Sequence, residues 1–208
     1  MKKFFLSLGL LAGISTAAQA QSTKFGIKAG ASLTNFAGGG ASGQGLFGFN
    51  GGAFANFALS DAISIQPEVL YSMKGFRREA SDNFYGTTFN VKATSRLHNI
   101  DVPVLARVTA NGLFMEFGPQ LGFNIAAKSK SEVTQGSRTT TSKDDFKNEI
   151  NTVELGFATG VGYQLTNGAG IGLRYNGGLT NISKNNRTSS AVRNSAFQLY
   201  LSFLFGGK

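Results

Sequence analysis

Eight ionisable side chains lie on the polar faces of segments in which apolar and polar residues alternate. If these side chains share one enclosed space, their acids and bases could interact. They support either a selective channel or proton path, or an interior salt-bridge network. Isolated charges in a narrow interior are costly, so we expect the two signs to pair and hydrogen-bond to one another. The set consists of Lys28, Glu68, Lys74, Asp101, Arg107, Glu116, Glu154 and Arg174.

The other reactive residue types do not form a catalytic motif. The single histidine, His98, lies near Ser95, Asp101 and Asp82 in the sequence, but a hydrolase needs base, carboxylate and nucleophile at one place. We interpret His98 as an interfacial histidine and Asp144–Asp145 as a solvated loop segment. Calcium-type aspartate spacing, a phosphate-binding glycine motif and a metal-ligand cluster are absent from the sequence. We therefore expect no catalytic, metal or cofactor-binding site.

The segments that carry these residues alternate with a period of two. Eight of them lie at residues 24–33, 47–59, 63–74, 97–108, 113–124, 153–163, 171–179 and 197–205. Such alternation over about ten residues is the length that a tilted strand needs to cross a bilayer. In the last segment we expect lipid to meet the apolar face, which carries Phe197, Leu199, Leu201, Phe203 and Phe205.

The connections between segments are short and long in turn. Tight turns are expected at residues 59–61, 109–112 and 166–169, and long polar loops at 35–46, 75–95, 126–150 and 183–194. An outer-membrane barrel has short periplasmic turns and longer outer loops. We therefore expect an all-β, eight-stranded antiparallel up-and-down transmembrane β-barrel over residues 21–208. Eight strands leave an interior just wide enough for side chains, so the charges are expected to fill it.

Prolines and glycines complicate the strand pattern. Pro67, Pro103 and Pro119 fall inside expected strands, and we expect a β-bulge at each of them. Many of the 28 glycines lie on polar faces, where small residues make room for longer side chains of neighbouring strands. The second segment is the least regular, because Phe54 shares a face with Asn50.

The long loops differ in composition. Residues 126–150 are polar and of mixed charge, which is typical of a mobile surface hairpin. Residues 75–95 also carry aromatic side chains, for which a partner site and anchoring at the outer membrane interface are both open, the second being the simpler explanation. These aromatic residues are Phe76, Phe84, Tyr85 and Phe89.

The N-terminus and the charge indicate export to a membrane. Residues 1–20 are typical of a signal peptide, with a positive start, an apolar stretch too short to span a bilayer, and Ala18-Gln19-Ala20 as a cleavage site. The chain has a formal net charge of +9, part of it from Lys2 and Lys3. The remaining scattered cations favour anionic lipid headgroups over nucleic acid as a partner. Cysteine is absent, which excludes disulfides and thiolate metal sites.

Five motifs stand in order along the chain: KFGIKAG at residues 24–30, IQPEVLYSMKG at 65–75, IDVPVLAR at 100–107, FGP at 117–119 and YNGGLTNI at 175–182. Together they resemble the PorT-like outer-membrane β-barrel family of Bacteroidota over nearly all of the mature chain. The resemblance implies an OmpA/OmpX-like eight-stranded barrel, and it carries over no catalytic residue. The founding member is linked to a protein secretion system, a role that fold similarity does not transfer.

These observations favour a small integral outer-membrane protein with a structural or surface-interaction role. We expect a monomer that contacts outer-membrane lipid, lipopolysaccharide and the barrel-assembly machinery, and whose loops meet an extracellular or envelope protein. A narrow porin or a component of a secretion apparatus is one alternative, and a barrel enzyme is another. A periplasmic lipocalin-like carrier is a third, although it would invert the two faces and the chain has no tryptophan.

Overall fold

The computed structural model describes residues 23–37, 44–84, 87–184 and 192–206. The expected export signal at residues 1–20 lies outside them, as do the middles of the expected loops at 35–46 and 183–194. The described residues form nine strands and one 3-10 helix, η1. These are β1 (Thr23–Ala37), β2 (Gln44–Ala58), β3 (Ile63–Phe84), β4 (Thr87–Ala110), β5 (Leu113–Gln135), β6 (Arg138–Asp145), η1 (Lys147–Glu149), β7 (Val153–Gln164), β8 (Ala169–Gly178) and β9 (Arg193–Leu204).

Eight of the nine strands close into a ring. Its order is β1, β2, β3, β4, β5, β7, β8 and β9, every neighbouring pair is antiparallel, and β9 pairs back onto β1. The closing register runs from Gly26 opposite Leu204 to Ala37 opposite Arg193. A closed ring has no free edge, so its backbone donors and acceptors are paired within the sheet. The expected all-β, up-and-down eight-stranded topology is confirmed, and β6 is an addition that pairs with β5 alone.

Strict alternation separates the two faces of the ring. In β5, residues 113–124 alternate between exposed outward side chains and buried inward ones. Apolar side chains such as Phe117, Leu173 and Phe197 are each about 60% exposed on the outer wall, whereas buried polar residues gather inside. The five apolar residues of the last segment, from Phe197 to Phe205, all lie on this outer wall. None of the described helices is long and apolar enough to span a membrane.

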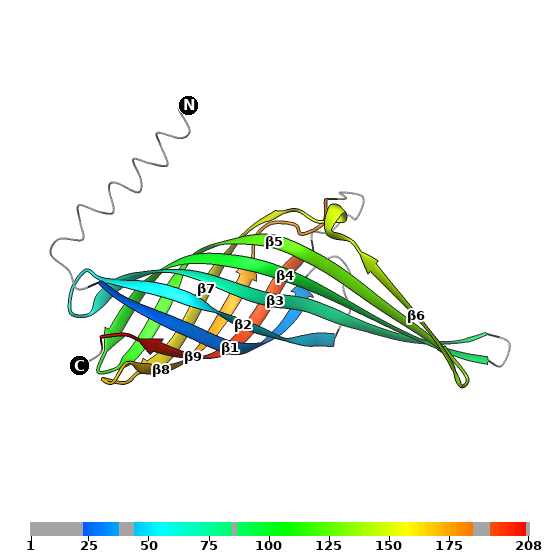
Figure 1. Ribbon diagram of the computed structural model, residues 1–208, viewed down its shortest axis with the longest axis horizontal. Coiled ribbons are helices and arrows are strands. Elements are labelled where there is room, and N and C mark those ends of the chain that lie inside the picture. Colours follow the sequence, from blue (N-terminus) through cyan, green and yellow to red (C-terminus); the bar gives the residue numbers. More distant parts are fainter. Residues whose placement is uncertain (1–22, 38–43, 85–86, 185–191, 207–208) are drawn as a thin grey trace, which may run out of the picture.

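Short turns join the strands at one end of the ring, which we call the turn end. Between β4 and β5 the loop consists of Asn111 and Gly112, with φ angles of 51° and 83°. Positive φ at both central residues defines the type I′ hairpin turn, whose twist matches that of the flanking strands. β1 begins and β9 ends at this same end (Figure 1). The three expected tight turns are therefore all present at the turn end.

At the opposite end, two of the expected loops are strands. β3, β4 and β5 have 22 to 24 residues, against 10 to 12 in β7, β8 and β9. Their outer parts run far beyond the ring, together with β6, as a twisted antiparallel sheet (Figure 1). We call this sheet the extension; it comprises residues 75–84, 87–96, 128–135 and 138–145. Long polar loops were expected at 75–95 and 126–150 because polar side chains hide the alternation that marks a strand. The surface hairpin that was expected within 126–150 is present, as the outer part of β5 paired with β6.

The prolines do not produce the expected bulges. The register runs without a shift through Pro67, Pro103 and Pro119. Each proline instead interrupts the ladder with the preceding strand of the ring for two residue pairs, as its missing N–H requires. The register shifts lie elsewhere, between Gly45 and Asn50 on β2 and at His98/Asn99 on β4.

A small apolar cluster lies where the ring meets the extension. Leu97 and Ala127 point inward from β4 and β5, and Ile150 and Ile182 reach them from the connecting segments. Phe146 and Val192 pack against this group. The segment after β6 therefore packs against the ring, whereas the sequence had suggested a wholly polar hairpin. The cluster anchors η1 over the outer ends of the ring strands.

Candidate functional site: the lumen network

Four of the eight ionisable residues meet in the middle of the lumen. Arg174 Nη1 and Nη2 donate to the two carboxylate oxygens of Glu68 at 2.7 and 2.9 Å, and its Nε donates to Glu116 Oε1 at 2.7 Å. Lys28 Nζ donates to Glu68 Oε1 at 2.8 Å. All four side chains are almost fully buried. Because β3 and β8 are four strands apart in either direction around the ring, the Glu68–Arg174 pair crosses the whole lumen.

Aromatic rings complete this central cluster. Tyr200 donates its hydroxyl to Glu116 Oε1 at 2.9 Å, and Lys28 Nζ lies 4.0 Å from the centroid of the Tyr200 ring. Nearer the turn end, the Arg107 guanidinium lies 3.6 Å from the centroid of the Phe114 ring. A cation over an aromatic face gains electrostatic stabilisation that increases when water is excluded. Tyr200 and Phe114 were not among the expected site residues; their positions on the polar face were the available signal.

Inward glycines make the room that these rings occupy. Gly172 is the register partner of Tyr200, and a Cβ added at Gly172 would lie 2.5 Å from the Tyr200 hydroxyl oxygen. Gly162 stands in the same relation to Phe114. The rings therefore lie flat across neighbouring strands only because those positions have no side chain.

The other four ionisable residues are held separately. Lys74 Nζ donates to Asp101 Oδ1 at 2.9 Å. Arg107 has no carboxylate partner among the described residues, and donates instead to the amide oxygens of Gln66 and Gln164 at 3.2 Å each.

Glu154 likewise lacks a cation partner in the described part of the chain. It accepts hydrogen bonds from the side-chain amides of Asn124 and Asn194, each at 2.7 Å. The lumen thus contains one four-residue charge cluster and one separate ion pair. The other two charges have neutral partners: side-chain amides and an aromatic ring for Arg107, and side-chain amides for Glu154. Opposite charges pair in six of the eight expected residues.

Buried polar side chains fill much of the lumen. A cavity of about 20 Å³ lies among Lys74, Gln120, Glu154 and Asn176, which is room for about one water molecule. Near it, the side-chain amides of Asn50 and Asn99 have no protein partner. Buried polar groups without protein partners are where ordered water binds in a lumen of this kind.

The described residues show no metal-binding group, and His98 does not contact Asp101. No set of three or more His, Asp or Glu side chains among them is arranged to hold a metal ion. His98 Nδ1 is hydrogen-bonded to the hydroxyl of Tyr71, which lies on the outer wall. Asp101 points inward to Lys74 and is therefore on the other side of the sheet from His98.

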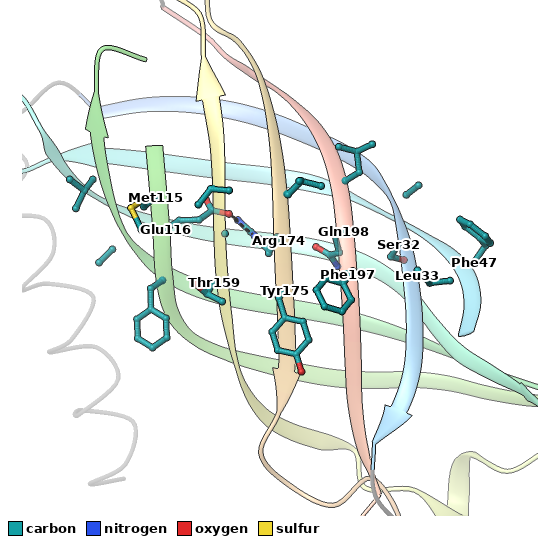
Figure 2. Close-up of a pocket in the computed structure, with 18 residues that line it drawn as sticks. Ser32, Leu33, Phe47, Met115, Glu116, Thr159, Arg174, Tyr175, Phe197 and Gln198 are labelled. Atoms are coloured by element: carbon teal, nitrogen blue, oxygen red, sulfur yellow. Dashed lines mark hydrogen bonds and ion pairs between the residues drawn. The ribbon is translucent and has the colours of Figure 1, made fainter. Parts of the chain in front are cut away.

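A large hollow lies on the outside of the ring. It is a shallow apolar groove of about 900 Å³ across the outer wall from β4 to β2 (Figure 2). Figure 2 shows the rings of Tyr175 and Phe197 together on neighbouring strands, with their centroids 4.9 Å apart. Such a surface is apolar enough to be covered by hydrocarbon rather than water.

A closed ring with an apolar outer wall and a polar filled interior defines a membrane-spanning β-barrel. A family model described as outer membrane protein beta-barrel domain matches residues 17–184. The chain therefore belongs to this family of bacterial outer-membrane barrels. None of the curated proteins matches the chain.

Solved structures with a similar fold have different roles. Ail, the attachment invasion locus protein of Yersinia pestis, is 13% identical, with coverage of 88% of this chain and 99% of Ail and a TM-score of 0.45. A major outer membrane protein from Thermus thermophilus is 15% identical, with coverage of 88% and 100% and a TM-score of 0.46. The outer membrane protease OmpT from Escherichia coli is 9% identical, with coverage of 90% and 100% and a TM-score of 0.40. Likeness at this level concerns the fold and assigns no role.

Proposed function

We propose that this protein is an outer-membrane barrel with a closed lumen, which acts at the cell surface through its extension and performs no catalysis. The observation that carries this proposal is the buried ion pair of Glu68 and Arg174, which spans the lumen between strands on opposite sides of the ring. A filled barrel cannot act through its interior, so the part that meets the environment is the sheet that continues past the ring.

The alternatives are less well supported by the same geometry. A narrow porin requires an open channel, whereas the lumen cavity described above has room for about one water molecule. A lipocalin-like carrier requires an apolar cavity and a polar outer wall, and this ring has the opposite arrangement. A barrel enzyme requires reactive groups that converge, and His98 and Asp101 lie on opposite faces of the sheet.

The finer assignments belong to the same proposal. We propose that residues 1–20 direct export and that the chain is a PorT-like barrel of Bacteroidota, supported by the five motifs quoted above. Its contacts would be outer-membrane lipid, lipopolysaccharide and the barrel-assembly machinery, with one envelope or extracellular protein bound by the extension of a monomer. A role in secretion would require such a protein partner rather than a pore.

Membrane fractionation tests the location. We expect the protein in the outer-membrane fraction, with an electrophoretic mobility that changes on boiling, as a closed barrel that resists unfolding in cold detergent does. A protein recovered in the soluble periplasm, with no mobility change on boiling, would contradict the proposal.

Crosslinking on intact cells tests whether the extension binds the protein partner. The matched control is a shortened chain in which an Asn-Gly turn joins Glu79 to Lys92 and another joins Glu132 to Thr141, since each pair is in register. We expect a partner that crosslinks to the full chain and is lost from the shortened one. A partner retained equally by both chains would place the interaction elsewhere.

A further inference from the structure

The outward face of the extension continues the outer wall of the barrel beyond the one-residue register shift at His98/Asn99. On this face Tyr71 lies opposite Ile100, and Met73 lies opposite His98 in the next row. Two further rows follow on the same face of the sheet because side chains alternate and the strands stay in register. The first contains Gly75, Arg96, Lys128 and Asp145, and the second contains Arg77, Thr94, Lys130 and Lys143.

The chemical character of the face changes abruptly at this boundary. Rows nearer the turn end carry exposed apolar residues such as Val104, Phe123 and Ile125. The two rows beyond carry five cations and one carboxylate. We call these five the basic groove; they are Arg77, Arg96, Lys128, Lys130 and Lys143. They line a hollow of about 780 Å³ together with Lys92 and the carboxylates of Glu132, Asp144 and Asp145, so cations outnumber acids around it.

The cations of the basic groove are largely unpaired. Among the described residues, no carboxylate lies within ion-pair distance of Arg96, Lys128 or Lys143. The only acid in the two rows, Asp145, accepts a hydrogen bond from the backbone N–H of Lys147 instead.

Acids at the outer edge of the groove offset only part of its charge. In the next row outward, the half-exposed Glu132 accepts a hydrogen bond from Lys130, which lowers the pKa of that carboxyl, and it offsets the charge of this one lysine. Glu79 lies 3.8 Å from Arg77 and 4.0 Å from Lys92, both at long ion-pair distance. The basic groove therefore keeps a local excess of positive charge directly above the apolar wall.

We propose that the basic groove binds the phosphate groups of the phosphorylated glycolipid that forms the outer leaflet. This inference rests on the proposed function, because it requires the extension to stand on the outer side of the membrane. An acyl chain that covers the wall below Met73 places its headgroup at the level of Arg96 and Lys128. Anionic groups held there meet several cations at once, and each cation adds to the attraction.

The test measures binding of a defined glycolipid to the full-length barrel in neutral detergent. The probe is deep-rough lipopolysaccharide with both lipid A phosphates, compared with the same preparation after removal of its phosphates. We expect removal to weaken binding by roughly tenfold to a hundredfold, and added salt to weaken binding of the phosphorylated form. Equal binding of the two preparations would overturn the proposal, and so would inorganic phosphate that binds as tightly as the glycolipid. This comparison requires no variant.

A matched pair of variants locates the site. The groove variant combines Arg96→Gln, Lys128→Gln and Lys143→Gln. The control removes the same number and types of cation outside the groove, in Arg138→Gln, Lys147→Gln and Lys184→Gln. We expect the groove variant to lose affinity as much as removal of phosphate does, and the control to bind like the native chain. A groove variant that binds normally would overturn the proposal.

The change of electrophoretic mobility on boiling, recorded for each sample, distinguishes a failure of the barrel fold from a failure of phosphate binding. A protein that never shows it would contradict the barrel itself. A folded barrel with no preference for phosphate would contradict the basic groove alone.

Discussion

Arg174 and Glu68, 106 residues apart in the chain, form a two-pronged ion pair across the middle of the barrel with N–O distances of 2.7 and 2.9 Å. Each partner also has a second opposite charge, since Arg174 contacts Glu116 and Glu68 contacts Lys28. The ion pair therefore connects four strands of the ring through side chains as well as through the sheet. A mutation in it should affect the whole barrel.

Glu68→Ala should destabilise the barrel by about 3–5 kcal/mol, because it leaves Arg174 and Lys28 buried without their shared carboxylate. Denaturant unfolding of the refolded protein in detergent measures the change. Glu79→Ala, which removes an exposed carboxylate from the same strand, is the control and should change the free energy of unfolding by less than about 0.5 kcal/mol. Similar changes in the free energy of unfolding of the two variants would show that the Glu68–Arg174 pair stabilises the barrel no more than an exposed carboxylate does.

Gly172→Ala should destabilise the barrel by about 1–3 kcal/mol, because the new methyl group would overlap the ring of Tyr200. Gly51→Ala is the control, since a Cβ there meets its nearest atom at 3.5 Å, an ordinary contact. Thermal unfolding compares the two variants. If Gly51→Ala proved the more damaging, the close approach of Gly172 to Tyr200 would not be what requires the glycine.

Alternation predicted the faces of the ring well, whereas the sequence could not identify partners across the lumen. Residues such as Phe117 and Phe197 lie on the outer wall because a strand places every second side chain on one face. The partners of Arg174 depend on ring closure, which brings β3 opposite β8, and no local pattern encodes that distance. The sequence also could not show that two asparagines hydrogen-bond to Glu154, since those asparagines come from β5 and β9.

The strands of the extension could not be predicted from the sequence for a different reason. Residues 138–145 are exposed throughout, so nothing in their hydrophobicity alternates, although β6 pairs with β5 from Lys128 to Gln135. Their strand structure comes from backbone pairing to a neighbour rather than from burial of one face. The predicted β-bulges at the prolines were wrong, because the missing backbone N–H of proline can interrupt pairing with one neighbouring strand without the extra residue that a bulge requires.

Introduced cysteines should report which end of the barrel faces outward, and the chain has none of its own to interfere. Ser142→Cys in the extension should react with a membrane-impermeant maleimide on intact cells. Asp61→Cys, in the turn between β2 and β3, should react only after the outer membrane is permeabilised. The reverse pattern of labelling would invert the orientation and remove the extension from the cell surface.

Ion conductance of the refolded barrel in planar lipid bilayers measures whether side chains close the lumen. The reconstituted protein, shown to be folded by its change of mobility on boiling, should produce no steady current at moderate voltage. Discrete and persistent conductance steps that scale with the amount of folded protein would contradict the closed lumen and restore the narrow porin as the function.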